Sequence, residues 1–86
     1  MTFEALAQVV ADDFKETMDT FGFDSFNEMA ECYWWDSKDI KEEVDSILRT
    51  KNTGAYIDEC DGSLVIKEDG DIEYRTFARM WRKLLK

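Results

Sequence analysis

The chain has 86 residues, of which 44% are hydrophobic and 14% aromatic, and its formal net charge is −9. This hydrophobic content is too high for a disordered acidic tail, so we predict one small folded domain over residues 1–86. The negative charge argues against direct binding to nucleic acid or to an anionic membrane, whereas a basic protein surface would attract the chain.

The charge is distributed unevenly along the chain. Residues 74–86 contain five basic and no acidic side chains, whereas residues 1–73 contain six basic and 20 acidic ones. The terminal segment therefore carries +5 and the remainder −14. Such a basic segment could bind nucleic acid, an acidic groove of a partner, or the acidic body of its own chain. We favour the last, because it needs no further molecule.

The cysteine content indicates a reducing compartment. Cys32 and Cys60 allow at most one disulfide, whereas small secreted domains usually carry a denser disulfide framework. The N-terminus shows neither the basic region nor the apolar stretch of a signal peptide, and no window approaches a membrane span. We therefore expect a cytoplasmic protein with two free thiols.

Three helices are predicted in the first part of the chain, each with apolar side chains at steps of three and four. They span about residues 2–21, 25–35 and 37–50. Their expected N-terminal caps are Thr2, Asp24 or Ser25, and the pair Asp36-Ser37.

After Asn52 the pattern changes to one typical of strands. Asp61-Gly62 separates two short apolar segments and predicts a type I′ turn, in which both central residues need positive φ. The resulting hairpin would span about residues 55–68 and place Ile57 opposite Ile66.

A second turn at Asp69-Gly70 leads into a terminal helix over about residues 72–86. The predicted fold is α+β and helix-dominated, with three N-terminal helices, a β-hairpin packed on them and a C-terminal helix. The expected core residues are Leu6, Val10, Phe14, Met18, Phe26, Met29, Val44, Ile47, Phe77, Trp81 and Leu84.

We predict that the protein is not an enzyme and uses no cofactor. Histidine, the commonest general base and metal ligand, is absent. Cys32 and Cys60 lack metal-ligand spacing, and the glycines form no phosphate-binding loop. A hydrolase based on paired carboxylates stays open as an alternative, although so small a domain offers little depth for a pocket.

Residues 69–80 resemble the second half of an EF-hand calcium site. With Gly70 at the sixth loop position, Val65 and Thr76 occupy the first and last positions, where neither supplies the required carboxylate. An overlapping register further upstream puts Ile57 in the first position. We therefore favour a hairpin followed by a helix over a metal site.

Three groups of carboxylates are candidate partner-binding residues. A solvated, solubilising face would explain any one group. Together, however, they leave a large uncompensated charge, and carboxylates along helix faces and a hairpin rim can imitate a row of phosphates, because Arg and Lys bind both. The candidates are Asp12, Asp13 and Glu16 in the first helix, Asp36, Asp39, Glu42 and Glu43 at the third, and Asp58, Glu59 and Asp61 in the hairpin.

Consecutive aromatic residues, Tyr33-Trp34-Trp35, precede the third helix. Trp34 is predicted to join the buried stripe of the second helix, with Tyr33 beside it. For Trp35 we favour packing against the hairpin or the terminal helix, because tryptophan is highly buried on average. The alternative makes Trp35 a partner-binding anchor beside the acidic residues.

In size and charge the chain resembles small phage-encoded inhibitors of bacterial defence, the anti-CRISPR and antirestriction DNA-mimic proteins. The resemblance covers no sequence motif. It implies an inhibitor in the cytoplasm of a bacterial host cell, which occupies the basic nucleic-acid-binding cleft of a partner such as a Cas9-type effector.

Two alternatives to this function stay open. In the first, the protein is a regulatory or structural adaptor that contacts its partner through Trp35 or the basic terminal helix. The second, a calcium-responsive module, lacks the ligands described above.

Overall fold

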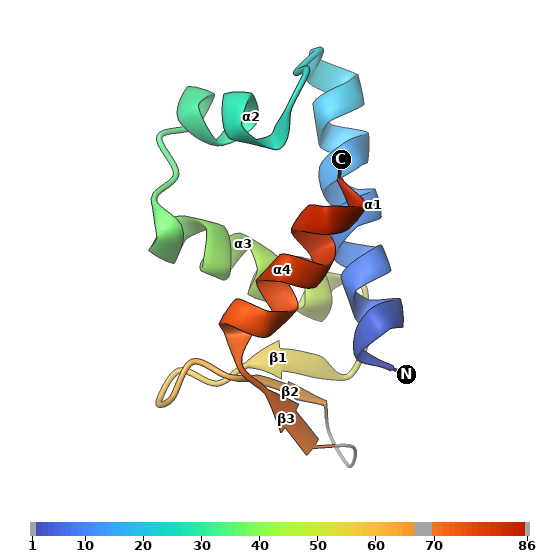
Figure 1. The fold of residues 1–86 in the computed structure, drawn as a ribbon, viewed down its shortest axis with the longest axis vertical. Coiled ribbons are helices and arrows are strands. Elements are labelled where there is room, and N and C mark those ends of the chain that lie inside the picture. Colours follow the sequence, from blue (N-terminus) through green and yellow to red (C-terminus); the bar gives the residue numbers. More distant parts are fainter. Residues whose placement is uncertain (1, 67–69, 86) are drawn as a thin grey trace.

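A computed structural model describes residues 2–66 and 70–85. Within these residues it contains four helices and a three-stranded antiparallel sheet, which confirms the helix-dominated α+β prediction (Figure 1). The elements in chain order are α1 (Phe3–Phe21), α2 (Phe26–Cys32), α3 (Ser37–Thr50), β1 (Ala55–Ile57), β2 (Leu64–Ile66), β3 (Gly70–Ile72) and α4 (Tyr74–Leu84).

The first three helices begin where the sequence supplies a cap. The side chains of Thr2 and Ser25 each accept a hydrogen bond from the backbone N–H three residues later, at 3.0 and 3.1 Å. At the start of α3, Asp36 and Asp39 form a reciprocal capping box. These bonds satisfy backbone donors that have no partner inside the helix, so the predicted helix starts are confirmed.

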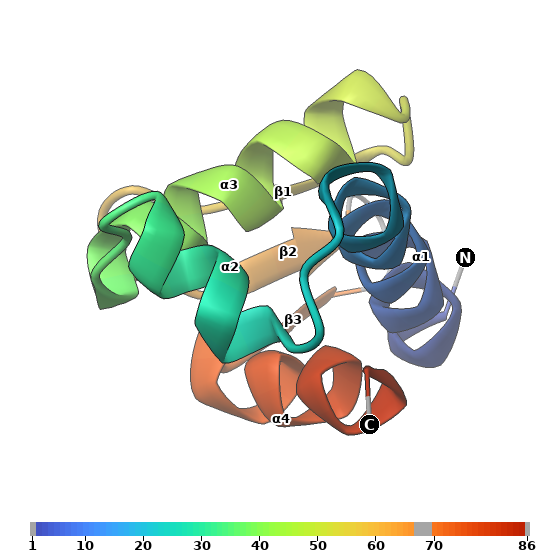
Figure 2. The same cartoon turned by 90° about the horizontal axis from the view of Figure 1, so that it is seen from above.

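α1 is the element on which the other helices assemble. It packs most extensively against α4 and also contacts α3 and α2. α3 and α4 lie on opposite sides of the molecule, and α3 packs against β1 (Figures 1 and 2). The two helices with the most strongly amphipathic sequences therefore face solvent in different directions.

The core contains side chains from every element except β3. Rings of Phe14, Phe26 and Trp81 contact one another with centroids 5.0 to 5.2 Å apart, and so join α1, α2 and α4. Ten of the predicted core residues are buried, but Leu84, at the last position of α4, is 37% exposed. Phe21, at the last position of α1, is likewise exposed.

The hairpin forms, but with a different register from the predicted one. Ile57 lies opposite Leu64, and Ile66 pairs with Ala55. The strands are therefore shorter than predicted and are joined by the six-residue loop 58–63 rather than by a two-residue turn. The predicted extension of the second strand over residues 67–68 lies outside the described residues.

The loop differs from a type I′ turn because only one of its residues has a positive φ. Gly62 has a φ of 76°, whereas Asp61 does not adopt the left-handed conformation that this turn requires. Instead, the Asp58 and Asp61 carboxylates accept hydrogen bonds from the backbone N–H groups of Cys60 and Ser63, at 2.7 and 2.9 Å. Such bonds are typical of Asx turns and stabilise the longer loop.

A third strand was not predicted. β3 pairs with β2, with Ile72 opposite Leu64 and Gly70 opposite Ile66. Glycine and aspartate are rare in strands, so Gly70-Asp71 indicated a turn rather than an edge strand. The strand delays the last helix, which begins at Tyr74 and not at 72; Asp69 of the predicted turn lies outside the described residues.

α2 is shorter than predicted because the chain reverses before residue 35. It ends at Cys32, and Trp34 has a left-handed φ of 60°. Trp34 N donates to Glu31 O (3.2 Å) and Trp35 N to Ala30 O (2.9 Å), which is the pattern of a Schellman motif. The reversal directs Trp34 away from the core, so its predicted burial is wrong. A left-handed backbone costs a non-glycine residue roughly 1–2 kcal/mol.

Replacing Trp81 with alanine should lower the free energy of unfolding by about 3–5 kcal/mol, because its side chain is fully buried against Phe14 and Phe26. Trp81→Phe should cost clearly less. It keeps a ring in the site, and it removes an indole Nε1 that is buried without a hydrogen-bond partner in the described part of the chain. Urea unfolding of both variants checks this. Equal losses would contradict this prediction, because a phenyl ring would then recover none of the packing that alanine removes.

Candidate interaction surface

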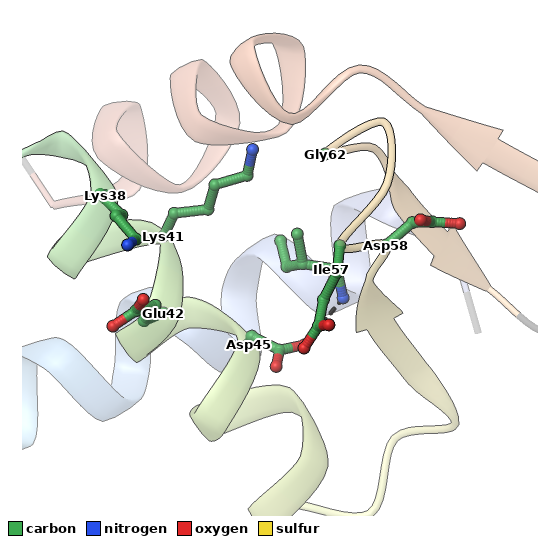
Figure 3. A pocket seen from close by; sticks show the side chains of 8 residues that line it. Lys38, Lys41, Glu42, Asp45, Ile57, Asp58 and Gly62 are labelled. Atoms are coloured by element: carbon green, nitrogen blue, oxygen red, sulfur yellow. Dashed lines mark hydrogen bonds between the residues drawn. The ribbon is translucent and has the colours of Figure 1, made fainter.

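Carboxylates from α3 and from the β1–β2 loop line a single groove of about 370 Å³ (Figure 3). The walls contain four carboxylates and two amines, so the groove is negatively charged. The lining residues are Lys38, Lys41, Glu42, Asp45, Ile57, Asp58, Glu59 and Gly62.

Asp45 fixes the geometry of this groove. Its Oδ1 accepts a hydrogen bond from Ile57 N (2.7 Å), shown dashed in Figure 3, and its Oδ2 pairs with Arg49 Nε (2.9 Å). The first bond ties α3 to β1, and the second holds the carboxylate in place. Asp45 was not among the candidate residues, and only the placement of β1 beside α3 reveals its role.

Lys41 connects three elements. In Figure 3 its side chain reaches from α3 toward Gly62, and its Nζ lies against that residue. The same Nζ is 5.2 Å from the centroid of the Tyr74 ring in α4, within range of a cation–π contact. Burial raises the pKa of Tyr74 to about 12, an effect opposed by Arg82.

The candidate carboxylates divide into two kinds. Asp36, Asp39, Asp58 and Asp61 accept hydrogen bonds that shape the backbone of this chain. The hydrogen bond from Asp39 N is the main cause that lowers the pKa of Asp36, and hydrogen bonds from Ser63 lower the pKa of Asp61. These four side chains therefore stabilise the fold of this chain itself, whether or not a partner is bound.

The remaining candidates are more available to a partner. On α1, Asp12 accepts a hydrogen bond from Gln8 (2.8 Å), and Asp13 lies 3.7 Å from Lys51. The other side chains make no hydrogen bond or ion pair with another residue in the ranges 2–66 and 70–85; these are Glu16, Glu42, Glu43 and Glu59.

The structure brings two of the three carboxylate groups together. Glu42 of α3 and Glu59 of the loop line the same groove. The α1 group lies elsewhere, because Asp13 contacts Lys51 just beyond the opposite end of α3. The acidic surface thus comprises two patches. The groove patch consists of the carboxylates that line the groove, Glu42, Asp45, Asp58 and Glu59. The α1 patch consists of Asp12, Asp13 and Glu16.

The basic helix α4 is not neutralised by these patches. The ion pairs within the described residues are Arg49–Asp45 and Lys51–Asp13, and neither involves α4. Arg82 instead stacks over the rings of Phe26 and Trp81, at 5.2 and 5.0 Å. Within the described residues no ion pair joins α4 to the acidic body, although α4 docks on α1 of that body and Arg82 lines a hollow together with Asp24. The favoured pairing of the terminal helix with the acidic body therefore stays a prediction.

Of the two neighbouring tryptophans, Trp35 packs against the core as favoured, whereas Trp34 does not. Trp35 is partly buried, with its ring 6.3 Å from Phe14 and 5.1 Å from Tyr33, so it packs toward α1 rather than toward the hairpin or α4. Trp34 is 89% exposed. The helix period suggested burial of Trp34, because it does not reveal where a helix ends.

Further features limit the chemistry of this surface. Over residues 2–66 and 70–85, no group of three His, Cys, Asp or Glu side chains is arranged to hold a metal ion. Cys32 and Cys60 are both exposed and unbridged. In the same ranges no helix is long and apolar enough to cross a membrane.

Comparison with family models, curated proteins and solved structures finds no match to this chain. The function must therefore be inferred from the charge, packing and exposed side chains described above.

The hydrogen bond between Asp45 and Ile57 can be tested by two substitutions. Asp45→Ala should lower the free energy of unfolding by about 1–3 kcal/mol, because it leaves the part-buried Ile57 N–H without its acceptor. Asp45→Asn should cost less, since the amide oxygen can still accept this bond. Thermal and urea unfolding would measure both, with exposed Glu42→Ala as a control expected within about 0.5 kcal/mol of wild type. Equal stability of Asp45→Ala and wild type would contradict the assignment.

Proposed function

We propose that this protein is a non-enzymatic, acidic interaction protein that occupies a basic nucleic-acid-binding surface of a partner protein. In this proposal it acts in the cytoplasm of a bacterial host as an inhibitor by DNA mimicry. A CRISPR effector or a similar defence nuclease is the class of target.

The observation that carries the proposal is the segregation of charge. Among the described residues no ion pair joins the groove patch or the α1 patch to α4, which carries four basic and no acidic side chains. Segregation of this kind costs stability through self-repulsion. A basic partner would relieve that repulsion, because its Arg and Lys side chains could bind the free carboxylates.

The dimensions suit a nucleic-acid cleft, but charge alone would not suffice for competition. The molecule is 38 Å long and carries a net charge of −9. Duplex DNA of that length carries about 22 phosphate charges, at one per about 1.7 Å of axis. The protein thus has less than half the charge of the DNA that it would displace, so an effective mimic needs contacts besides charge.

A double charge reversal in the groove patch tests the proposal. Glu42→Lys with Glu59→Lys, both exposed residues of the groove, should weaken displacement of labelled target DNA from a guide-loaded Cas9-type effector by about tenfold or more, because the new charges repel a basic cleft. Neither side chain has a polar partner among the described residues, so the melting temperature should change little. Fluorescence anisotropy would measure the displacement, and added salt should weaken the wild type.

The matched control is Asp12→Lys with Glu16→Lys, which changes the net charge equally on the α1 patch. Equal effects of both pairs would assign inhibition to total charge rather than to the groove patch. If excess wild-type protein left the DNA bound at low salt, mimicry of DNA toward this target class would be contradicted.

A second candidate function, a regulatory adaptor, is favoured by the uncompensated basic face of α4. Arg75 and Arg79 are exposed and could contact an acidic partner. Reversal of both to Glu should abolish binding by an adaptor of this kind, whereas a DNA mimic should retain or improve its binding to a basic cleft.

A further inference from the structure

Trp34 has the left-handed backbone conformation that ends α2. At the ends of two other helices of this chain, residues that tolerate this conformation occupy the equivalent position. α1, α2 and α3 are followed by Gly22, Trp34 and Asn52, with φ of 76°, 60° and 59°. In each case the next N–H donates to the carbonyl five residues earlier, at 2.9, 2.9 and 3.2 Å. Glycine and asparagine tolerate this left-handed conformation, whereas a bulky aromatic residue rarely adopts it.

The surrounding contacts hold Trp34 in this unfavourable place. Trp35 packs toward Phe14, and Tyr33 stacks against Trp35 and lies 5.9 Å from Phe23. The aromatic residues on both sides of Trp34 are therefore engaged, while Trp34 itself is 89% exposed. The left-handed backbone of Trp34 is offset only by the hydrogen bonds that end α2, and the exposed indole gains no stabilisation from burial. A residue that is held in this way is a candidate for recognition of another molecule.

The charge around Trp34 indicates what it would recognise. Residues 16–37 contain six carboxylates and no Lys or Arg. Glu31 and Asp36, on either side of Trp34 in the sequence, are both exposed. Carboxylates repel phosphate groups, which disfavours stacking on a nucleic-acid base, but they attract a cation. Tryptophan offers the best aromatic face for a cation, and the planar guanidinium of arginine both stacks on such a face and pairs with carboxylates.

We propose that Trp34 is the anchor of the partner interface and stacks on an arginine of the partner's basic surface, with the exposed Glu31 beside the guanidinium. This inference rests on the proposed function and specifies the side chain that is recognised. The stacking of Trp34 on arginine also adds a contact that does not depend on net charge alone. A mimic with less than half the charge density of DNA requires such a contact.

The test uses oligo-arginine and oligo-lysine peptides of equal length as probes, with binding measured by isothermal titration calorimetry at low salt. Wild-type protein should bind the arginine peptide more tightly. Trp34→Gly should lose about tenfold or more of that affinity and most of the preference for arginine, while its melting temperature stays equal to or rises above that of wild type. Trp34→Phe should retain most of the preference.

Asn52→Gly is the matched control, because it makes the same kind of change at the equivalent position after α3. It should leave both affinities unchanged. Trp34→Gly with wild-type affinity for the arginine peptide would overturn the anchor, although Glu42→Lys with Glu59→Lys could still weaken binding and support the proposed function. Wild-type protein that binds neither peptide at low salt would contradict the proposed function and the anchor together. Sedimentation that shows a dimer for wild type and a monomer for Trp34→Gly would instead make a second copy the occupant and overturn the proposal.

Discussion

The contact among Phe14, Phe26 and Trp81 determines how the rest of the molecule is arranged. These rings come from α1, α2 and the distant terminal helix α4, and their centroids lie 5.0 to 5.2 Å apart. A chain of 86 residues has room for few such contacts, so their loss would remove much of a stability that is small in domains of this size. Because this contact holds α4 on α1, α4 meets α3 only near its first turn, where Tyr74 lies under Lys41, and no described ion pair joins it to the carboxylates of the groove.

The separation of charge links the packing to the proposed function. A sequence with this composition could fold with its cations distributed among its anions, which would reduce self-repulsion. In this molecule Arg82 instead stacks on Phe26 and Trp81, and the carboxylates of the groove patch face solvent. The packing of the core therefore leaves carboxylates that repel one another in the free protein. A basic partner would turn this repulsion into attraction.

The carboxylates that look alike in the sequence have different roles in the structure. Asp36 and Asp39 cap a helix, Asp58 and Asp61 shape a loop, and Asp45 joins α3 to β1. Only the remainder, Glu42 among them, are available to recognise a partner without cost to the fold. A test that reverses every acidic residue would confuse these roles, which is why the groove and α1 pairs are the informative substitutions.

The sequence by itself determined the helices that carry their own signals. Caps and apolar periodicity are local, so the starts of α1, α2 and α3, the α+β class and nearly all of the core followed from them. The ends of elements did not. The register of β1 with β2, the edge strand β3 and the exposure of Trp34 depend on contacts between distant segments, such as the packing of Trp35 toward Phe14. Periodicity assigns residues to faces of a helix, but tertiary packing decides where the helix ends and which neighbour each face meets.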